Sequence, residues 1–334
     1  MQDRLLFVVS PPRSGSTLLQ RLLGSHSEIF THPEPHLVTP LAYLGYYDTV
    51  DKAPYDHINA AQALRLFVDG LPRKEDDYLD ALRAYADTMY GRILEPSGRR
   101  MFLDKTPAYA LVLDFLSKLY PRAKYVVLTR HPLAVMSSYA NSFFQGDWET
   151  ARAFNPVVER YVPAMARFLR EQRVPMVHVS YETLVSDPEP QLERMFRFLG
   201  LAHEPEAVEY GTRFKAKKGP GDPISVEKHD RPVTESVDKW AAELAHDERK
   251  LAIARDMVER LDPVDLETWG YPKATLFDAL HNVNGAARAP RAPALNTYTI
   301  QRRVMLALKK NIHERPHGKL IKKVRYYCDV LLRE

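Results

Sequence analysis

Short apolar runs alternate with longer amphipathic stretches through most of the chain. Each run ends in a polar turn, which is typical of buried strands that deliver side chains into loops. Between the runs, apolar residues recur at helical spacing, first at Leu18, Leu19, Leu22 and Leu23. We therefore predict strands at 5–9, 28–30, 101–103, 124–129 and 176–180. We predict one helix that begins after residue 16 and mostly helical structure across 40–94. Further helices are predicted from after 107 to about 120, from 132 through 138, and from 188 to 199.

Strands that alternate with helices predict right-handed crossovers and a mostly parallel sheet. The expected fold class is α/β, a three-layer sandwich with a central sheet flanked by helices, of the P-loop-like type. We expect a main domain at 1–275, with a helical insertion at about 40–95. Residues 276–334 are expected to form a linker and a basic helical C-terminal extension.

Composition limits the size of the core, the expected location and the kinds of cysteine site that the chain can have. The chain has 334 residues, of which 45% are hydrophobic and 27% charged, which is enough to bury a sizeable core. The run at 5–9 is too short for a signal sequence or a membrane span, so a cytoplasmic location is the expectation. Cys328 is the single cysteine, which excludes an intrachain disulfide and a cysteine-based metal cluster.

Charge is unevenly distributed. Residues 296–334 contain ten Lys or Arg against three acids, a net +7, so the rest of the chain carries −3 of the total +4. Apolar residues at helical spacing in this tail predict two amphipathic helices. The tail could contact an anionic membrane or an acidic carrier protein, or simply form a helical arm with a solvated basic face. No recognised nucleic-acid-binding module is present.

The stretch after the first strand has the chemistry of an anion-binding loop. Gly15 permits close approach of the backbone, Ser14, Ser16 and Thr17 supply hydroxyl groups, and Arg13 supplies a planar guanidinium. The N–H groups at the start of the following helix favour an anion there. The nucleotide-triphosphatase form Gly-x-x-x-x-Gly-Lys-Ser/Thr is absent, so the loop is better suited to holding phosphate than to hydrolysing a metal nucleotide. The alternative is a tight turn before a buried helix.

Two further cations follow predicted strands. Lys105 follows the strand at 101–103, and Arg130 follows the strand at 124–129. Ligands of such sheets bind at the carboxyl ends of the strands, where these residues and Arg13 are expected to meet. Unpaired buried charge is costly, so three cations on one rim predict an anionic ligand.

Taken together, the motifs resemble the sulfotransferases that use 3′-phosphoadenosine 5′-phosphosulfate (PAPS), over about residues 4–272. The run 12–19 resembles the loop for the 5′-phosphosulfate. Arg130-His131-Pro132 with Ser138 resembles the 3′-phosphate site. Tyr181-Glu182-Thr183 resembles the segment that supports the adenosine. The loop position that is Lys in the cytosolic enzymes of the family is Arg13 here. In this respect the chain resembles the branch that includes the tyrosyl-protein and many bacterial enzymes.

The resemblance implies roles for other residues. Glu34, twenty-one residues after Arg13, corresponds to the base of that branch, and Lys105-Thr106-Pro107 corresponds to a Lys-x-Pro whose Lys contacts the transferring group. Arg231-Pro232-Val233 resembles a segment that closes over the nucleotide. His36 and His229 stay as rival bases, since His is the base in the cytosolic branch. No metal is implied.

The implied acceptor is a hydroxyl on a small molecule, a lipid, a glycan or an acyl chain on a carrier protein. Aromatic residues at Tyr43, Tyr46, Tyr47 and Tyr55 favour an apolar or amphipathic alcohol, although such a stripe also fits an ordinary core. Two other functions share the fold: a P-loop kinase acting on a small molecule, and a non-catalytic anion-binding protein.

Overall fold

A five-stranded parallel sheet forms the centre of the computed structural model, which describes residues 1–48, 50, 57–214, 229–283, 316, 320 and 324. The strands are β1 (Leu5–Val9), β2 (Ile29–Thr31), β3 (Met101–Lys105), β4 (Lys124–Thr129) and β5 (Met176–Ser180). Their order is β2-β3-β1-β4-β5, and all four pairings are parallel. All five predicted strands and the predicted fold class are confirmed.

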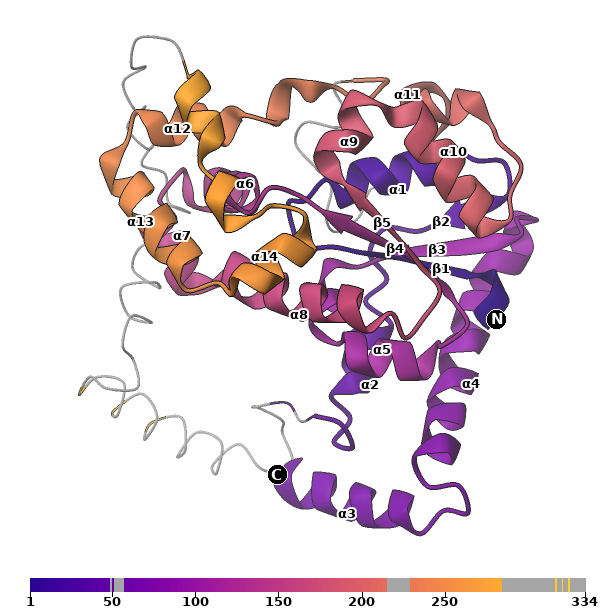
Figure 1. Ribbon diagram of the computed structural model, residues 1–334. Coiled ribbons are helices and arrows are strands. Elements are labelled where there is room, and N and C mark those ends of the chain that lie inside the picture. The colour runs from indigo at the N-terminus through magenta and orange to yellow at the C-terminus, as the bar shows by residue number, and fades with distance from the viewer. Residues whose placement is uncertain are drawn as a thin grey trace.

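Helices cover both faces of this sheet (Figure 1). One face carries α1 (Ser16–Gly24), α9 (Tyr181–Ser186), α10 (Pro188–Leu199) and α11 (Tyr210–Arg213). The other carries α2 (Val38–Ala42), α4 (Glu75–Leu94), α5 (Leu113–Leu119), α6 (Pro132–Phe144), α7 (Trp148–Phe154), α8 (Val157–Glu171), α12 (Lys239–Ala245), α13 (Glu248–Glu259) and α14 (Pro263–Trp269). Short 3₁₀ helices lie at Gln2–Arg4, Glu95–Ser97, Pro107–Leu111, Pro205–Val208, Thr234–Ser236, Lys273–Thr275 and Asp278–Asn282.

The central strand shows why the sequence forms two core layers. Every residue of β1 is fully buried, and successive side chains of a strand point to opposite faces. Leu5, Phe7 and Val9 join the core under α5 and α8. Leu6 and Val8 join the core under α1 and α10. A continuous apolar run, rather than alternation, is what a strand covered on both faces requires.

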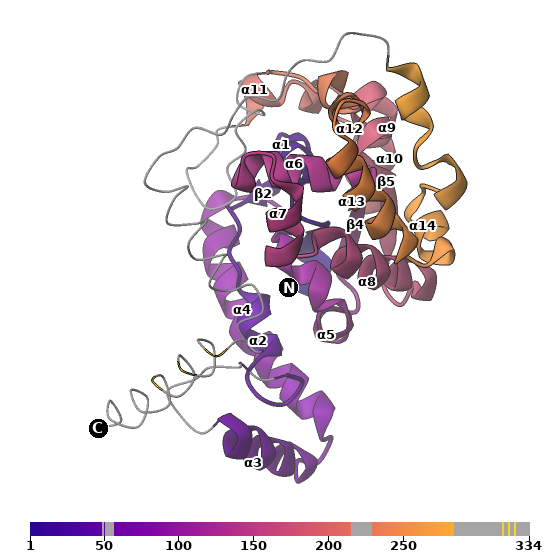
Figure 2. The ribbon, with the colours of Figure 1, turned by 90° about the vertical axis from the view of Figure 1, so that its left-hand side faces the viewer.

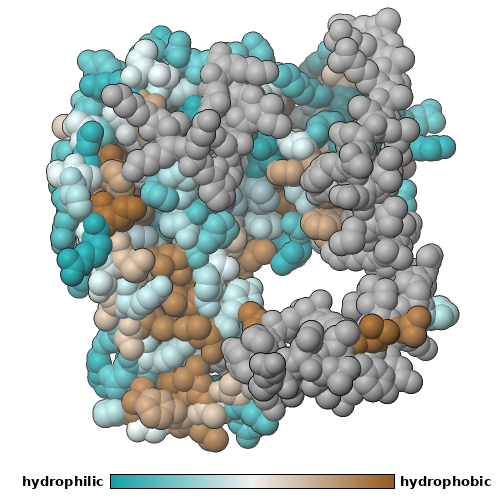
Figure 3. All heavy atoms as spheres, turned by 180° about the vertical axis from the view of Figure 1, so that it is seen from behind, coloured by the Kyte–Doolittle hydropathy of each residue, from teal (hydrophilic) through white to brown (hydrophobic). Residues whose placement is uncertain are grey.

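The region predicted as a helical insertion is built of α2, α3 (His57–Asp69) and α4. Figure 2 shows that α3 and the nearby end of α4 project from the body. Hydrophobic side chains gather over α2 and α3 (Figure 3), and Leu66 and Phe67 of α3 are among the exposed ones. The predicted amphipathic tail lies outside the described residues except for helical positions at Pro316, Leu320 and Val324.

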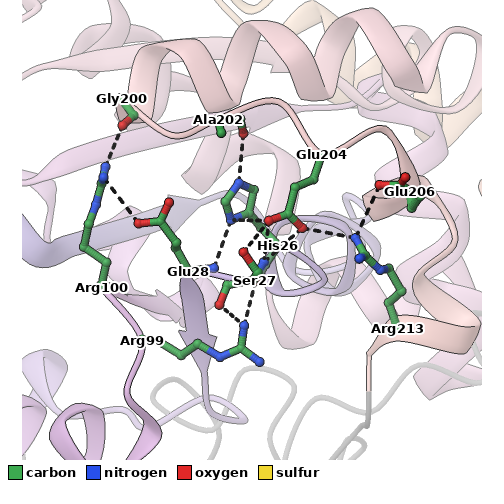
Figure 4. A network of polar contacts seen from close by, with 10 residues as sticks. All are labelled: His26, Ser27, Glu28, Arg99, Arg100, Gly200, Ala202, Glu204, Glu206 and Arg213. Carbon is green, nitrogen blue, oxygen red and sulfur yellow. Dashed lines mark hydrogen bonds and ion pairs between the residues drawn. The ribbon is translucent and has the colours of Figure 1, made fainter.

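Charged and polar residues at the amino ends of β2 and β3 form a network of hydrogen bonds and ion pairs with the segment after α10 (Figure 4). Buried His26 accepts the N–H of Glu28 at 3.0 Å and donates to the carbonyl of Ala202 at 2.9 Å. Glu204 accepts from Ser27 and pairs with Arg213 at 3.1 Å. These charges are already satisfied by one another, so this rim has a structural role and leaves the carboxyl rim as the place for a ligand.

Candidate active site

The loop between β1 and α1 has the backbone geometry of an anion cradle. Arg13 and Gly15 both have positive φ values, +68° and +91°. A Cβ added at Gly15 would lie 2.4 Å from Cδ2 of the Tyr181 ring, so only glycine fits under that ring. The first turn of α1 has no side-chain cap, which leaves backbone N–H groups to receive a ligand.

Two guanidinium groups meet beside this loop. Arg130 donates from Nη1 to the carbonyl of Arg13 at 3.0 Å, and Arg13 donates from Nε to Oγ of Ser138 at 3.3 Å. The guanidinium carbon of Arg130 lies 4.2 Å from the centroid of the Tyr181 ring. The structure thus brings together the loop, Arg130, Ser138 and Tyr181, which the sequence predicted to act in one site.

Neither arginine forms an ion pair with any acid in the described part of the chain. Burial lowers the pKa of Arg130. The pKa of Arg13 is also lowered, mainly by burial and to a smaller extent by the nearby charge of Arg130. Two desolvated cations side by side are costly, and a bound anion would offset that cost.

Two buried polar atoms at this place lack partners among the described residues. They are Oγ of Ser14 and Nε of Arg130. Buried donors without partners are rare and point to a missing ligand. Phosphate or sulfate groups bound at the loop and beside Arg130 would supply the acceptors that these atoms need. The residues present therefore fit an anionic ligand.

Lys105 and Glu34 form a close ion pair at the edge of the same loop. Nζ of Lys105 lies 2.5 Å from Oε1 of Glu34 and 3.4 Å from Oγ1 of Thr17. The Lys105 side chain is 2% exposed and that of Glu34 is 12% exposed. His36, with φ of +51°, places Nε2 3.5 Å from Oε2 of Glu34, but its side chain is 49% exposed. A buried cation, a carboxylate and an anion cradle thus share one small volume.

A second group of residues fixes Arg130-His131, and Trp269 is the member that the sequence did not indicate. The His131 ring stacks on Trp240 at 4.2 Å, and Glu182 accepts the His131 N–H at 3.1 Å. Trp269 donates from Nε1 to the carbonyl of Arg130 at 2.9 Å. Burial lowers the pKa of His131 to about 4, so the ring is neutral at pH 7. The sequence motifs had pointed to His131, to Glu182 and, through the Lys239-Trp240 pair after Arg231-Pro232-Val233, to Trp240, whereas no signal pointed to Trp269.

Four other predicted residues lie outside this cluster or next to residues that the structure does not describe. Arg231 is half exposed and pairs with Glu189 at 2.5 Å and Glu209 at 3.3 Å, so its part in donor binding stays a prediction. His229 is partly buried and directly follows residues outside the description. Tyr46 and Tyr47 pack on Tyr78 and Phe115 with centroids 4.7–6.4 Å apart, which is the core arrangement rather than an open acceptor wall.

Asp104 is a buried carboxylate beside the site, and its environment was not evident from the sequence. It is fully buried, and burial raises its pKa from 3.8 to about 6. Between these values the native state holds the proton and the unfolded chain does not, so stability due to this group falls as pH rises from about 4 to 6. The two-unit difference corresponds to about 3 kcal/mol.

We expect Asp104→Asn to abolish this pH dependence. The free energy of unfolding of the wild type minus that of the variant should fall by about 3 kcal/mol between pH 4 and pH 7, measured by denaturant titration at several pH values. Asp3→Asn, which changes an exposed carboxylate, serves as control. A difference that stays constant across pH would contradict the shifted titration.

Within the described residues, no helix is long and apolar enough to cross a bilayer. The same part of the chain contains no cluster of three or more His, Cys, Asp or Glu that could hold a metal ion.

Comparison with known proteins gives concordant matches. A model described as "Sulfotransferase family" matches residues 6–205. The nodulation protein NoeE of Sinorhizobium fredii is 29% identical over 269 residues, covering 73% of this chain and 61% of NoeE. Protein-tyrosine sulfotransferase 1 of Danio rerio is 24% identical over 302 residues, covering 86% of this chain and 80% of that protein. The chain thus spans about three fifths of NoeE.

Among solved structures, the sulfotransferase domain from the curacin biosynthetic pathway aligns with a TM-score of 0.47 at 23% identity. That alignment covers 70% of this chain and 89% of the domain.

Proposed function

The chain belongs to the sulfotransferase family, and from this premise we propose that it transfers a sulfuryl group from PAPS to the hydroxyl of an acceptor. The observation that carries the proposal is the contact of Lys105 with both Glu34 and Thr17. It joins a candidate base, a buried cation and the phosphate-type loop within hydrogen-bonding reach of one amine.

The donor is held by residues already described. Arg13, the α1 N–H groups and Ser14 accommodate the 5′-phosphosulfate, and Arg130 with Ser138 accommodates the 3′-phosphate. Supporting this, Ser14 and Arg130 carry the buried atoms without partners. Tyr181 lies between Gly15 and Arg130 and offers a ring surface that fixes their separation.

The proposed reaction is in-line displacement at sulfur. Glu34 takes the proton of the acceptor hydroxyl while the acceptor oxygen bonds to sulfur and the bond from sulfur to the phosphate oxygen breaks. Arg13 and Lys105 offset the negative charge that develops on the leaving phosphate. Before the donor binds, Lys105 is held by Glu34 at 2.5 Å, so the anion and the carboxylate compete for the same amine. Donor binding therefore draws Lys105 toward the phosphate and frees the Glu34 carboxylate to face the acceptor hydroxyl.

Calorimetry tests donor recognition. We expect adenosine 3′,5′-bisphosphate to bind more tightly than adenosine 5′-phosphate and ATP, because Arg130 and Ser138 form a separate site for the 3′-phosphate. Arg130→Met should remove the preference for the bisphosphate over the monophosphate. Tight binding of ATP with no binding of the bisphosphate would favour the kinase alternative instead.

Turnover is then measured with ³⁵S-labelled PAPS and a screen of acceptors of different chemistry: 4-nitrophenol, a tyrosine-containing peptide, octanol and N-acetylglucosamine. A cytoplasmic location and a contact of the basic tail with a membrane or an acidic carrier stay predictions.

A further inference from the structure

Asp104 is the centre of a hydrogen-bond network directly beside Lys105. Its Oδ2 accepts from the hydroxyl of Tyr90 at 2.6 Å and from the hydroxyl of Tyr109 at 2.9 Å, while Oδ1 accepts from Thr106 at 3.0 Å. The carboxylate and both tyrosine rings are completely buried. Such fully satisfied buried networks are rigid, and this one fixes the end of β3 where Lys105 lies.

The two tyrosines differ in one contact. Tyr90 comes from α4, and its hydroxyl has Asp104 as its only hydrogen-bond partner among the described residues. Tyr109 comes from the 3₁₀ helix Pro107–Leu111, and its oxygen also accepts the backbone N–H of Val38 at 3.1 Å. Because the Tyr109 hydroxyl donates its hydrogen bond to Asp104, the lone pairs of its oxygen are free to accept the N–H of Val38.

Val38 needs this acceptor. It is the first residue of α2, where N–H groups have no partner inside the helix, and Leu37 before it supplies no side-chain cap. Tyr109 therefore takes the place of a capping residue from a distant part of the chain. An N–H at a buried position without an acceptor would be costly.

The hydrogen bond from the Val38 N–H to Tyr109 lies at one end of the segment that carries Glu34. At the other end, Gln20 of α1 donates to the carbonyl of His32 at 3.0 Å and to Oγ1 of Thr31 at 2.8 Å. Residues 33–37 run between these two anchors, and the positive φ of His36 lies among them. The place of the Glu34 carboxylate relative to Lys105 depends on both anchors.

We propose that Tyr109 is a positioning residue for Glu34, linking the segment at 33–37 to Asp104 and hence to the neighbouring Lys105. Base and cation then share one rigid support, so their separation is set by β3 rather than by a free loop. This inference rests on the proposed function, because it assigns Glu34 as the base. Tyr109 is fully buried, so in this proposal it acts through the segment at 33–37 rather than on the donor or the acceptor directly.

Tyr109→Phe and Tyr90→Phe form a matched pair that tests the proposal. Both variants keep a buried ring and both remove one hydrogen bond to Oδ2 of Asp104. Only Tyr109→Phe also removes the acceptor of the Val38 N–H. Three measurements are made on the full chain: amide hydrogen exchange at Val38, calorimetry with adenosine 3′,5′-bisphosphate, and kcat with the best acceptor of the screen. Thermal unfolding reports on general damage.

We expect Tyr109→Phe to speed exchange at Val38 and to lower kcat about tenfold, in line with the sensitivity of rates to misplaced groups. Bisphosphate affinity should stay within twofold of the wild type, since Arg13, Ser14 and Arg130 are untouched. Tyr90→Phe should leave both exchange and kcat close to the wild type, and should lower Tm less than Tyr109→Phe because it leaves no buried backbone N–H without an acceptor. Equal effects of the two variants, or normal exchange at Val38 in Tyr109→Phe, would overturn the positioning role.

The proposed function fails separately. A wild type that neither binds the bisphosphate nor turns over PAPS would refute sulfuryl transfer, while the exchange comparison would still show whether Tyr109 holds the segment.

Discussion

Glu34→Gln is expected to lower kcat for sulfuryl transfer by about 10²–10⁴-fold, the range typical of general-base assistance. Glutamine keeps the size of the side chain but cannot accept the acceptor proton at pH 7. Donor affinity should be unchanged or higher, because Lys105 loses the carboxylate that holds it at 2.5 Å and becomes fully available to the anion. The measurement is single-turnover transfer from labelled PAPS, with calorimetry for donor binding.

Rival bases supply the controls. His36 lies 3.5 Å from Glu34 with φ of +51°, a conformation that asparagine tolerates, so His36→Asn tests the imidazole without forcing the backbone. We expect this variant and His229→Asn to lose much less activity than Glu34→Gln. A larger loss in either histidine variant, with near-normal turnover in Glu34→Gln, would move the base to that histidine.

Lys105→Met is expected to lower kcat by about 10²–10³-fold, the effect of removing one preorganised charge from a transition-state site. The Lys105 side chain is 2% exposed, so water cannot replace its charge. In contrast to Glu34→Gln, this variant should also weaken binding of adenosine 3′,5′-bisphosphate. Rate and affinity are measured by the same two assays, which therefore separate the cation from the base.

Lys124→Met provides a matched control for Lys105→Met. Lys124 is a partly buried lysine at the amino end of β4, and its Nζ donates to the carbonyl of Phe198 at 3.3 Å. The chemical change is identical, but it lies on the opposite rim of the sheet. Comparable loss of turnover in the two variants would mean that Lys105 acts through stability alone. The double variant Glu34→Gln/Lys105→Met should lose less than the product of the single losses, because the two groups share one contact.

Local pattern was sufficient for the strands and for the anion loop. All five strands were predicted within two residues at each end. The inner strands β1, β3 and β4 are buried along almost their whole length, and a strand buried on both faces is largely apolar. The cations Arg13, Lys105 and Arg130 were also predicted to meet, because β3, β1 and β4 are parallel neighbours whose carboxyl ends share one rim. No prediction was made for the helices α7 and α8 or for α12, α13 and α14.

Residue roles that depend on a single long-range contact were decided by tertiary structure. The sequence marked Glu34 and Lys105 separately, but their contact spans 71 positions, and that of Arg13 with Ser138 spans 125. The capping of Val38 by Tyr109 and the choice of Asp104 as its support carry no sequence motif at all.

The physical reason is the range of the forces that set each feature. The patterns of apolar residues in strands and helices reflect which side chains are buried. Because burial recurs at many positions, the pattern can be recognised from the sequence. A hydrogen bond such as that of Tyr109 to Val38 depends on where two packed segments place two atoms, to within a few tenths of an ångström. Sequence alone therefore determined the strands and the rim of the sheet on which the three cations meet, whereas only the packed structure determined how Glu34 and Lys105 are held together.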